Sequence, residues 1–183
     1  MPITAFVTDI GNDLAYEVPV ETVVQWVETS FDRLTSLGAQ IVLSDLPMDA
    51  LRQVQETRYR LFRTILFPEC RLSWSEMLGR AEQLSQRLQE LAQEREIPFF
   101  VGRKEWYGLD PIHPRRACYP ALWSALMSLV VDTDDDLSIP RCPWTLAWQL
   151  RRLQPERWAW FSISRRSTQP SGRLRDGSTI SLY

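Results

Sequence analysis

The sequence predicts an α/β protein in which a parallel sheet is followed by a small β appendage. Short apolar segments at 3–10, 40–46 and 97–101 are typical of buried strands, and helical segments separate them. A strand, a helix and a second strand at this spacing form a βαβ unit, whose strands run parallel with a right-handed crossover. Beyond residue 140 the pattern changes to short alternating segments rich in tryptophan and arginine.

Two of the helical segments carry clear end signals. Residues 20–37 repeat apolar side chains at helical spacing, and Gly38 follows at the position of a left-handed C-terminal cap. Ser73 and Glu76 form a capping box, which predicts that a helix begins there and extends to about residue 95.

Three further segments are less regular. Residues 49–67 form a weaker helical pattern, which Pro68 ends. Residues 102–117 are polar and predict a long loop. A helix is expected over 120–131, because Pro120 suits the first turn of a helix.

A boundary between two parts of the chain is expected near 132–140. An acidic run occupies this stretch, and the chain beyond it is rich in arginine. The prediction is an α/β domain over 1–131 and a Trp/Arg-rich appendage over 132–183. Within the appendage, 157–164 alternates like one strand, and Asp176-Gly177 predicts a turn between two short strands.

Composition excludes several classes of protein. The formal net charge of −2 provides no basic field for nucleic acid, and the single histidine excludes sites that need two. The three cysteines form no C-x-x-C pair, so we expect neither a disulfide framework nor a zinc site. No signal peptide and no apolar run long enough to span a membrane are found. We expect a soluble, cytoplasmic protein that needs no metal or organic cofactor.

Two polar loops follow predicted strands, at the end where open α/β sheets bind their ligands. In the first, Gly11 allows a tight turn next to Asp13, and the Asn12 amide can donate to developing negative charge. In the second, Asp110 can hold one ring nitrogen of His113 and leave the other as a general base. Taken singly, each loop also fits a plain turn or surface loop.

With both loops considered together, the chain resembles the SGNH (GDSL-type) hydrolases, a family of serine esterases and lipases. The segment Gly11-Asn12-Asp13 matches the last three positions of the family's G-x-N-D block, with Ile10 in place of its first glycine. The segment Asp110-Pro-Ile-His113 matches the D-x-x-H block in full. The resemblance covers about residues 3–131 and leaves the tail unexplained.

The resemblance implies a flavodoxin-like, three-layer α/β/α fold that hydrolyses a small-molecule ester through a Ser-His-Asp triad. It implies that Asn12 donates to the oxyanion, that His113 is the general base and that Asp110 orients it. Gly11 and Asp13 would shape the loop that carries Asn12.

The chain departs from the family at the nucleophile. In the family, a serine block and a second glycine block precede the Asn-Asp block, whereas Gly11 here lies close to the first residue. Ser44 ends the second predicted strand and is expected to face the adjoining loop. We therefore expect an N-terminally incomplete sheet and negligible esterase activity for the chain alone. Strand 3–10 would then be an exposed edge, open to pairing with a missing N-terminal segment or a second chain.

Two interpretations remain open at this point. The chain is either part of a hydrolase whose serine is supplied from elsewhere, or a catalytically inactive α/β module that uses the fold for binding. An in-frame Gly-Asp-Ser block in the DNA upstream of Met1 would favour the first.

Three arginines, the Trp/Arg-rich tail and one cysteine could each have a structural or a functional role. Arg58, Arg60 and Arg63 could border a cleft for an acidic substrate or form a solvated helix face. The Trp and Arg residues of the tail could stack on bases or sugars, or could form the core of a small β element docked on the main domain. Cys118 would serve as a nucleophile only if its thiol reached the imidazole in space.

Overall fold

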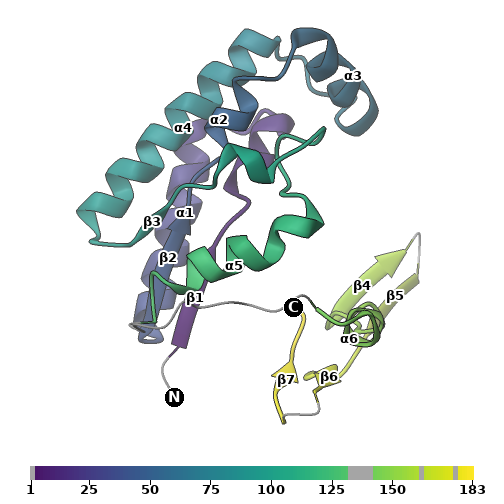
Figure 1. The fold of residues 1–183 in the computed structure, drawn as a ribbon. Helices are drawn as coiled ribbons and strands as arrows, with labels where there is room; N and C mark the ends of the chain where they lie inside the picture. The colour runs from purple at the N-terminus through teal and green to yellow at the C-terminus, as the bar shows by residue number, and fades with distance from the viewer. Residues whose placement is uncertain (1–2, 132–141, 161–162, 175–176) are drawn as a thin grey trace. The chain divides into compact units, whose positions relative to one another are not determined.

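A computed structural model describes residues 3–131, 142–160, 163–174 and 177–183 (Figure 1). Contacts within the chain divide it into two compact units, residues 1–139 and residues 140–183. The first unit holds the parallel sheet, and the second holds its own short antiparallel strand pairs.

The sheet of the first unit has three strands in the order β1-β2-β3, and both pairs are parallel. The strands are β1 (Ile3–Val7), β2 (Ala39–Ser44) and β3 (Phe99–Phe100). The predicted α/β class with a parallel sheet is therefore confirmed. Within the described residues, β1 lies at an edge of the sheet and pairs only with β2.

Strand β1 is shorter than the predicted strand 3–10, because the backbone turns sharply after it. Asp9 adopts a left-handed conformation with φ of 59°, which ends extended pairing. The chain then enters the 3₁₀ helix η1 (Ile10–Tyr16), which contains the Gly-Asn-Asp segment. The polar segment after the first strand is thus a helical turn and not an open loop.

The first long helix is α1 (Val20–Ser36), and Gly38 follows it with a φ of +70°. Both features agree with the prediction. The segment 49–67 was predicted as one helix, whereas the structure has two, α2 (Met48–Leu51) and α3 (Glu56–Leu66). The chain turns between them so that Val54 becomes buried, and this tertiary contact outweighs the local helical pattern.

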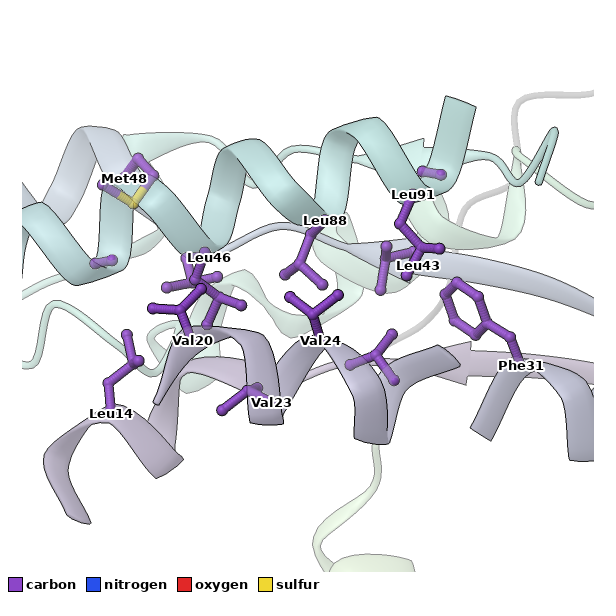
Figure 2. Packing of buried hydrophobic residues seen from close by; sticks show 14 of the residues in the cluster. Leu14, Val20, Val23, Val24, Phe31, Leu43, Leu46, Met48, Leu88 and Leu91 are labelled. Carbon is purple, nitrogen blue, oxygen red and sulfur yellow. The ribbon is translucent and has the colours of Figure 1, made fainter. Parts of the chain in front are cut away.

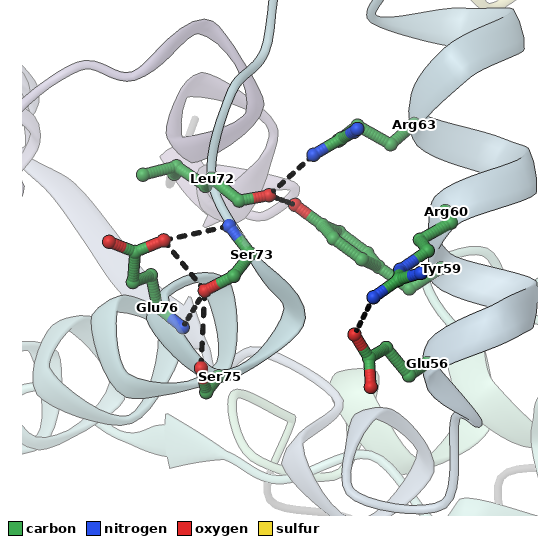
Figure 3. A network of polar contacts seen from close by, with 8 residues as sticks. All are labelled: Glu56, Tyr59, Arg60, Arg63, Leu72, Ser73, Ser75 and Glu76. Carbon is green, nitrogen blue, oxygen red and sulfur yellow. Dashed lines mark hydrogen bonds and ion pairs between the residues drawn. The ribbon is translucent and has the colours of Figure 1, made fainter.

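Helix α4 (Trp74–Glu94) begins at the predicted capping box. The Glu76 amide donates to Ser73 Oγ at 3.3 Å, and the Ser73 amide donates to Glu76 Oε2 at 2.8 Å (Figure 3). The same corner ties α3 to the start of α4, because Tyr59 Oη and Arg63 Nη1 each donate to the Leu72 carbonyl at 2.9 Å. Burial raises the pKa of Tyr59, which stays a hydroxyl donor.

Hydrophobic clusters cover both faces of the sheet. In β2, Ile41 and Leu43 join the larger cluster, which packs α1 and α4 together, and Figure 2 shows Val24 and Leu88 pointing toward each other across it. The alternate residue Val42 joins the smaller cluster on the opposite face, beneath α5 (Tyr119–Met127). The buried members of that smaller cluster are Val42, Phe100, Trp106 and Leu126.

The second unit contains the helix α6 (Trp144–Leu150), which the sequence analysis did not predict. The segment 157–164 is not one strand, because β4 (Arg157–Trp160) pairs antiparallel with β5 (Ile163–Arg166). A second pair joins β6 (Gly172–Arg173) to β7 (Thr179–Ile180), and Asp176 of the predicted turn lies outside the described residues.

The tryptophans of α6 do not form the core that was expected of them. The exposed fractions of Trp144 and Trp148 are 82% and 59%. The guanidinium carbon of Arg152 lies over the Trp148 ring, 4.7 Å from its centroid. The guanidinium carbon of Arg165 lies over the ring of Trp158 in β4, 5.6 Å from its centroid. A guanidinium over one face of an exposed ring makes a favourable cation–π contact.

Candidate functional site

The two residues predicted as orienting acid and general base are in contact. His113 Nδ1 lies 2.7 Å from Asp110 Oδ2. The other oxygen of the same carboxylate accepts the backbone amides of Ile112 at 2.9 Å and of His113 at 3.1 Å. This Asx-type turn follows from the spacing, since an aspartate accepts amides two and three residues further along.

The electrostatics of Asp110 favour its charged form. Burial acts to raise the pKa of Asp110, yet hydrogen bonds from the Ile112 amide, the His113 ring and the His113 amide together lower it below its ordinary value. The carboxylate therefore stays ionised and holds the ring at Nδ1, which leaves Nε2 without a partner among the described residues. The side chain of His113 is 56% exposed, so Nε2 is open to a ligand.

The loop that carries the pair is anchored at its neck and at one side. The Arg115 amide donates to the Trp106 carbonyl at 2.7 Å, which closes the loop. Trp106 is buried and stacks on Phe100 of β3 at 6.1 Å between ring centroids. From α3, Arg58 Nη2 donates to the Gly108 carbonyl at 3.2 Å.

The predicted oxyanion donor Asn12 lies in η1, which follows β1. Its side chain is half-buried and has no hydrogen-bond partner within the described part of the chain. Gly11 packs closely against Leu46, because a Cβ at this position would lie 2.9 Å from Leu46 Cδ2. The backbone carbonyl of Asp13 accepts the Val18 amide at 3.3 Å, which closes the turn.

The structure places Asn12 and His113 after the carboxyl ends of β1 and β3, which lie at the same edge of the sheet because all three strands are parallel. Figure 1 shows both segments on the side of the unit toward α3. Among the described residues, no hydrogen bond joins Asn12 to His113.

Tyr107 and Asp45 also lie at the carboxyl end of the sheet, and neither was predicted from the sequence as a site residue. Burial raises the pKa of Tyr107, and the carboxylates of Asp9 and Asp45 raise it further. Asp45 follows β2 directly, and its carboxylate accepts the Leu46 amide at 2.7 Å and the hydroxyl of Ser85 at 3.0 Å. Its charge near the carboxyl end of the predicted strand 40–46 was the signal that could have found it.

The pKa of Asp45 is shifted in the opposite direction from that of Asp110. Burial raises the pKa of Asp45, and the hydrogen bonds from Ser85 and the Leu46 amide, together with the charge of Arg52, offset this only in part. Two carboxyl groups at one edge of the sheet therefore have opposite environments, one exposed and hydrogen-bonded and one desolvated.

No nucleophile contacts His113 among the described residues, where its ring bonds to Asp110 alone. The Ser44 hydroxyl donates to the neighbouring Asp45 carbonyl at 3.2 Å. Cys118 packs against the smaller hydrophobic cluster. These two candidates are therefore engaged elsewhere.

The three arginines of α3 have separate environments. Arg60 pairs with Glu56 at 2.6 Å on the solvated side of the helix, and Arg63 binds the Leu72 carbonyl. Arg58 alone points to the loop of His113, where it binds the Gly108 carbonyl.

In the part of the chain that the structure describes, no group of three or more His, Cys, Asp or Glu side chains is arranged to hold a metal ion. Over the same residues, no helix combines the length and apolar character needed to cross a bilayer. Comparisons with protein-family models, with curated proteins and with solved structures each found no match. The resemblance to the SGNH hydrolases therefore rests on the two short motifs and their placement.

Proposed function

We propose that this chain carries the acid–base half of an SGNH-type ester hydrolase on a flavodoxin-like sheet. His113 removes the proton of the attacking nucleophile, Asp110 orients the imidazole, and Asn12 donates to the developing oxyanion. The observation that carries the proposal is the 2.7 Å contact between His113 Nδ1 and Asp110 Oδ2 in the loop after β3. Ligand sites of open α/β sheets lie at this edge.

The arrangement of the pair suits general-base catalysis. A carboxylate at Nδ1 selects one tautomer of the ring and stabilises the imidazolium that forms when Nε2 takes a proton. The exposure of His113 supports access of an ester to Nε2. Asn12 has an uncommitted amide, which is the state that an oxyanion donor needs before substrate binds.

The proposal requires a nucleophilic serine, and none of the described serines contacts His113. The outermost strand β1 could pair with an added parallel strand on its free side. The carboxyl end of that strand would lie at the same end of the sheet as Asn12 and His113. A serine directly after that strand would then face the imidazole. The chain alone is expected to show negligible turnover of p-nitrophenyl acetate.

Chemical rescue tests the proposal on the chain as it stands. If His113 is a base that lacks its nucleophile, added methanol should restore release of p-nitrophenol well above the rate of free imidazole at equal concentration. His113→Ala should reduce the rescued rate by about 10²-fold. Asn12→Ala should reduce it by at least about tenfold, because one oxyanion donor is lost.

The matched control is Gln25→Ala, which removes a side-chain amide from the exposed face of α1 and lies outside the proposed site. It should leave the rescued rate within about twofold of the native value. A rescued rate equal to that of imidazole, and unchanged in the Asn12 and His113 variants, would refute the proposal. Sustained turnover without methanol that depends on His113 would instead reveal a nucleophile in this chain.

The second candidate is a catalytically inactive binding module. It is favoured by one observation, namely that no serine or cysteine contacts His113 among the described residues. It predicts no rescue by methanol and no effect of His113→Ala on binding of a partner.

A further inference from the structure

Two cavities lie beside the loop of His113, and they share Gln53 and Lys104 in their walls. The larger, of about 600 Å³, lies beside Asp49, Arg52 and Glu105. One of its two arginines is matched by carboxylates, because Arg52 lies 3.7 Å from Asp49 and 3.1 Å from Glu82. The other, Arg103, lies over the Trp106 ring, 5.7 Å from the ring centroid. The larger cavity therefore has no unmatched charge at Arg52.

The smaller cavity, of about 160 Å³, has a different wall. Two cationic side chains and two neutral polar ones line it, and none of the described residues in its wall is acidic. The residues that line it are Ala50, Gln53, Arg58, Lys104, Tyr107, Gly108 and Pro111. This composition fits a negatively charged group.

The cations of this wall lack carboxylate partners. Lys104 makes no ion pair with any described residue. Arg58 is held in place by the Gly108 carbonyl, yet its Nε is buried without a hydrogen-bond partner. A buried charged donor without an acceptor is costly, so an anion beside this guanidinium would be favourable.

The orientation of Arg58 is set by the rest of its helix. Tyr59 and Arg63 both bind the Leu72 carbonyl, which holds α3 against the start of α4 (Figure 3). This contact leaves Arg58 on the side of Gly108. The cationic group is thus positioned before any ligand arrives.

We propose that this cavity binds the oxyanion group, a phosphate or a carboxylate, of a small-molecule ligand. Its volume is sufficient for such a group. Gly108 and Pro111 flank Asp110 in the sequence, so the cavity borders the catalytic loop of the proposed function. The assignment of the ligand as an anionic ester substrate rests on that proposed function.

The experiment uses Lys104 as a probe, because it is the only lysine in the chain. Reductive methylation with ¹³C labels Lys104 and the N-terminal amine and keeps both charges. Inorganic phosphate and acetate are titrated separately at constant ionic strength. The Lys104 signal should shift and saturate with at least one of the two anions, and the N-terminal signal should stay constant.

Variants then localise the binding. Arg58→Gln should weaken it by about tenfold or more, because a charge-assisted partner is lost. Arg60→Gln is the matched control, since it removes the same charge from the same helix outside the cavity, and it should leave the affinity unchanged. If Arg58→Gln does not fold, the exposed Gln53→Ala carries the test and should weaken binding severalfold.

Saturation by phosphate assigns a phosphorylated ligand, and saturation by acetate assigns a carboxylated one. The proposal would be overturned if the Lys104 signal shifted linearly with anion concentration or moved in parallel with the N-terminal signal. It would also be overturned if the Gln53 and Arg58 variants bound the anion as tightly as the native chain does. Binding without methanol rescue would keep the anion site and remove its assignment to an ester substrate. Rescue without binding would keep the hydrolase proposal and remove the anion site.

Discussion

The Asp110 carboxylate binds three donors of its own turn, of which the nearest is His113 Nδ1 at 2.7 Å. One oxygen orders the backbone of the loop and the other orders the imidazole. The side chain that would support catalysis therefore also builds the loop, and the two roles can be separated only by measurements that distinguish stability from rate.

The first prediction concerns Asp110→Asn and its dependence on pH. The pKa of Asp110 is lowered in the folded state, so its stabilising effect is present above its ordinary value of 3.8 and is lost as the pH falls through the folded value. At pH 7 the variant should lose about 0.5–1 kcal/mol of unfolding free energy, a figure discounted for the exposure of the carboxylate.

Urea denaturation at pH 7 and at pH 2–3, followed by tryptophan fluorescence, measures this difference. It should shrink toward zero at the acid end, because the native carboxyl group is then protonated too. Ser75→Ala, which removes no titratable group, is the control and should show no such trend. A difference between Asp110→Asn and the native chain that is equal at both pH values would contradict the assignment.

The second prediction concerns Asp45, whose pKa is shifted in the direction opposite to that of Asp110. Its folded pKa is raised, so its contribution to stability is greatest below its ordinary value of 3.8 and declines as the pH rises through the folded value. Asp45→Asn keeps an acceptor for the Leu46 amide and a partner for Ser85 without a buried charge. At pH 7 it should stabilise the protein by less than about 1 kcal/mol, and this gain should vanish near pH 3.

The control for this prediction is Ser85→Ala, which removes one hydrogen bond and leaves the carboxylate. It should destabilise the protein at pH 7 by about 1 kcal/mol. Loss of stability in Asp45→Asn at pH 7 would show that the charge is needed where it lies.

The third prediction tests the close approach of Tyr107 to Gly102. A Cβ at residue 102 would lie 2.6 Å from Tyr107 Oη, so Gly102→Ala must displace the half-buried ring. The variant should lose about 1–2 kcal/mol of unfolding free energy. In a Tyr107→Phe background the clashing oxygen is absent, and the same substitution should cost about half as much or less.

Gly79→Ala provides the contrast, because a Cβ there meets nothing within 4 Å and the residue lies in α4. It should raise the unfolding free energy by about 0.5–1 kcal/mol. Equal costs of Gly102→Ala in the two backgrounds would place the strain somewhere other than at the hydroxyl.

The fourth prediction concerns the start of α4. Ser73→Ala removes the side-chain acceptor of the Glu76 amide and should cost about 1 kcal/mol of unfolding free energy. Ser75→Ala is the matched control, because Ser75 contacts only the Ser73 hydroxyl and not the backbone cap. Differential scanning calorimetry should therefore place the melting temperature of Ser73→Ala below that of Ser75→Ala.

The sequence determined those features whose stabilising contacts are made between residues close together in the chain. The capping box at Ser73, the glycine after α1 and the Asp110–His113 turn each depend on partners at most a few residues apart. The parallel direction of the strands also followed from sequence, because a helix that connects two strands of one sheet returns the chain to the end where the first strand began. Asn12 lies beyond β1, inside a 3₁₀ helix and not in an open loop.

Tertiary structure decided the features that depend on distant partners. The division of 49–67 into α2 and α3 comes from burial of Val54, and the charge of Asp45 raises the pKa of Tyr107 although the two residues are far apart in the chain. The same holds for the cavity between α3 and the loop after β3. Periodicity reports which face of a segment is apolar, but it carries no information on which other segment will cover that face.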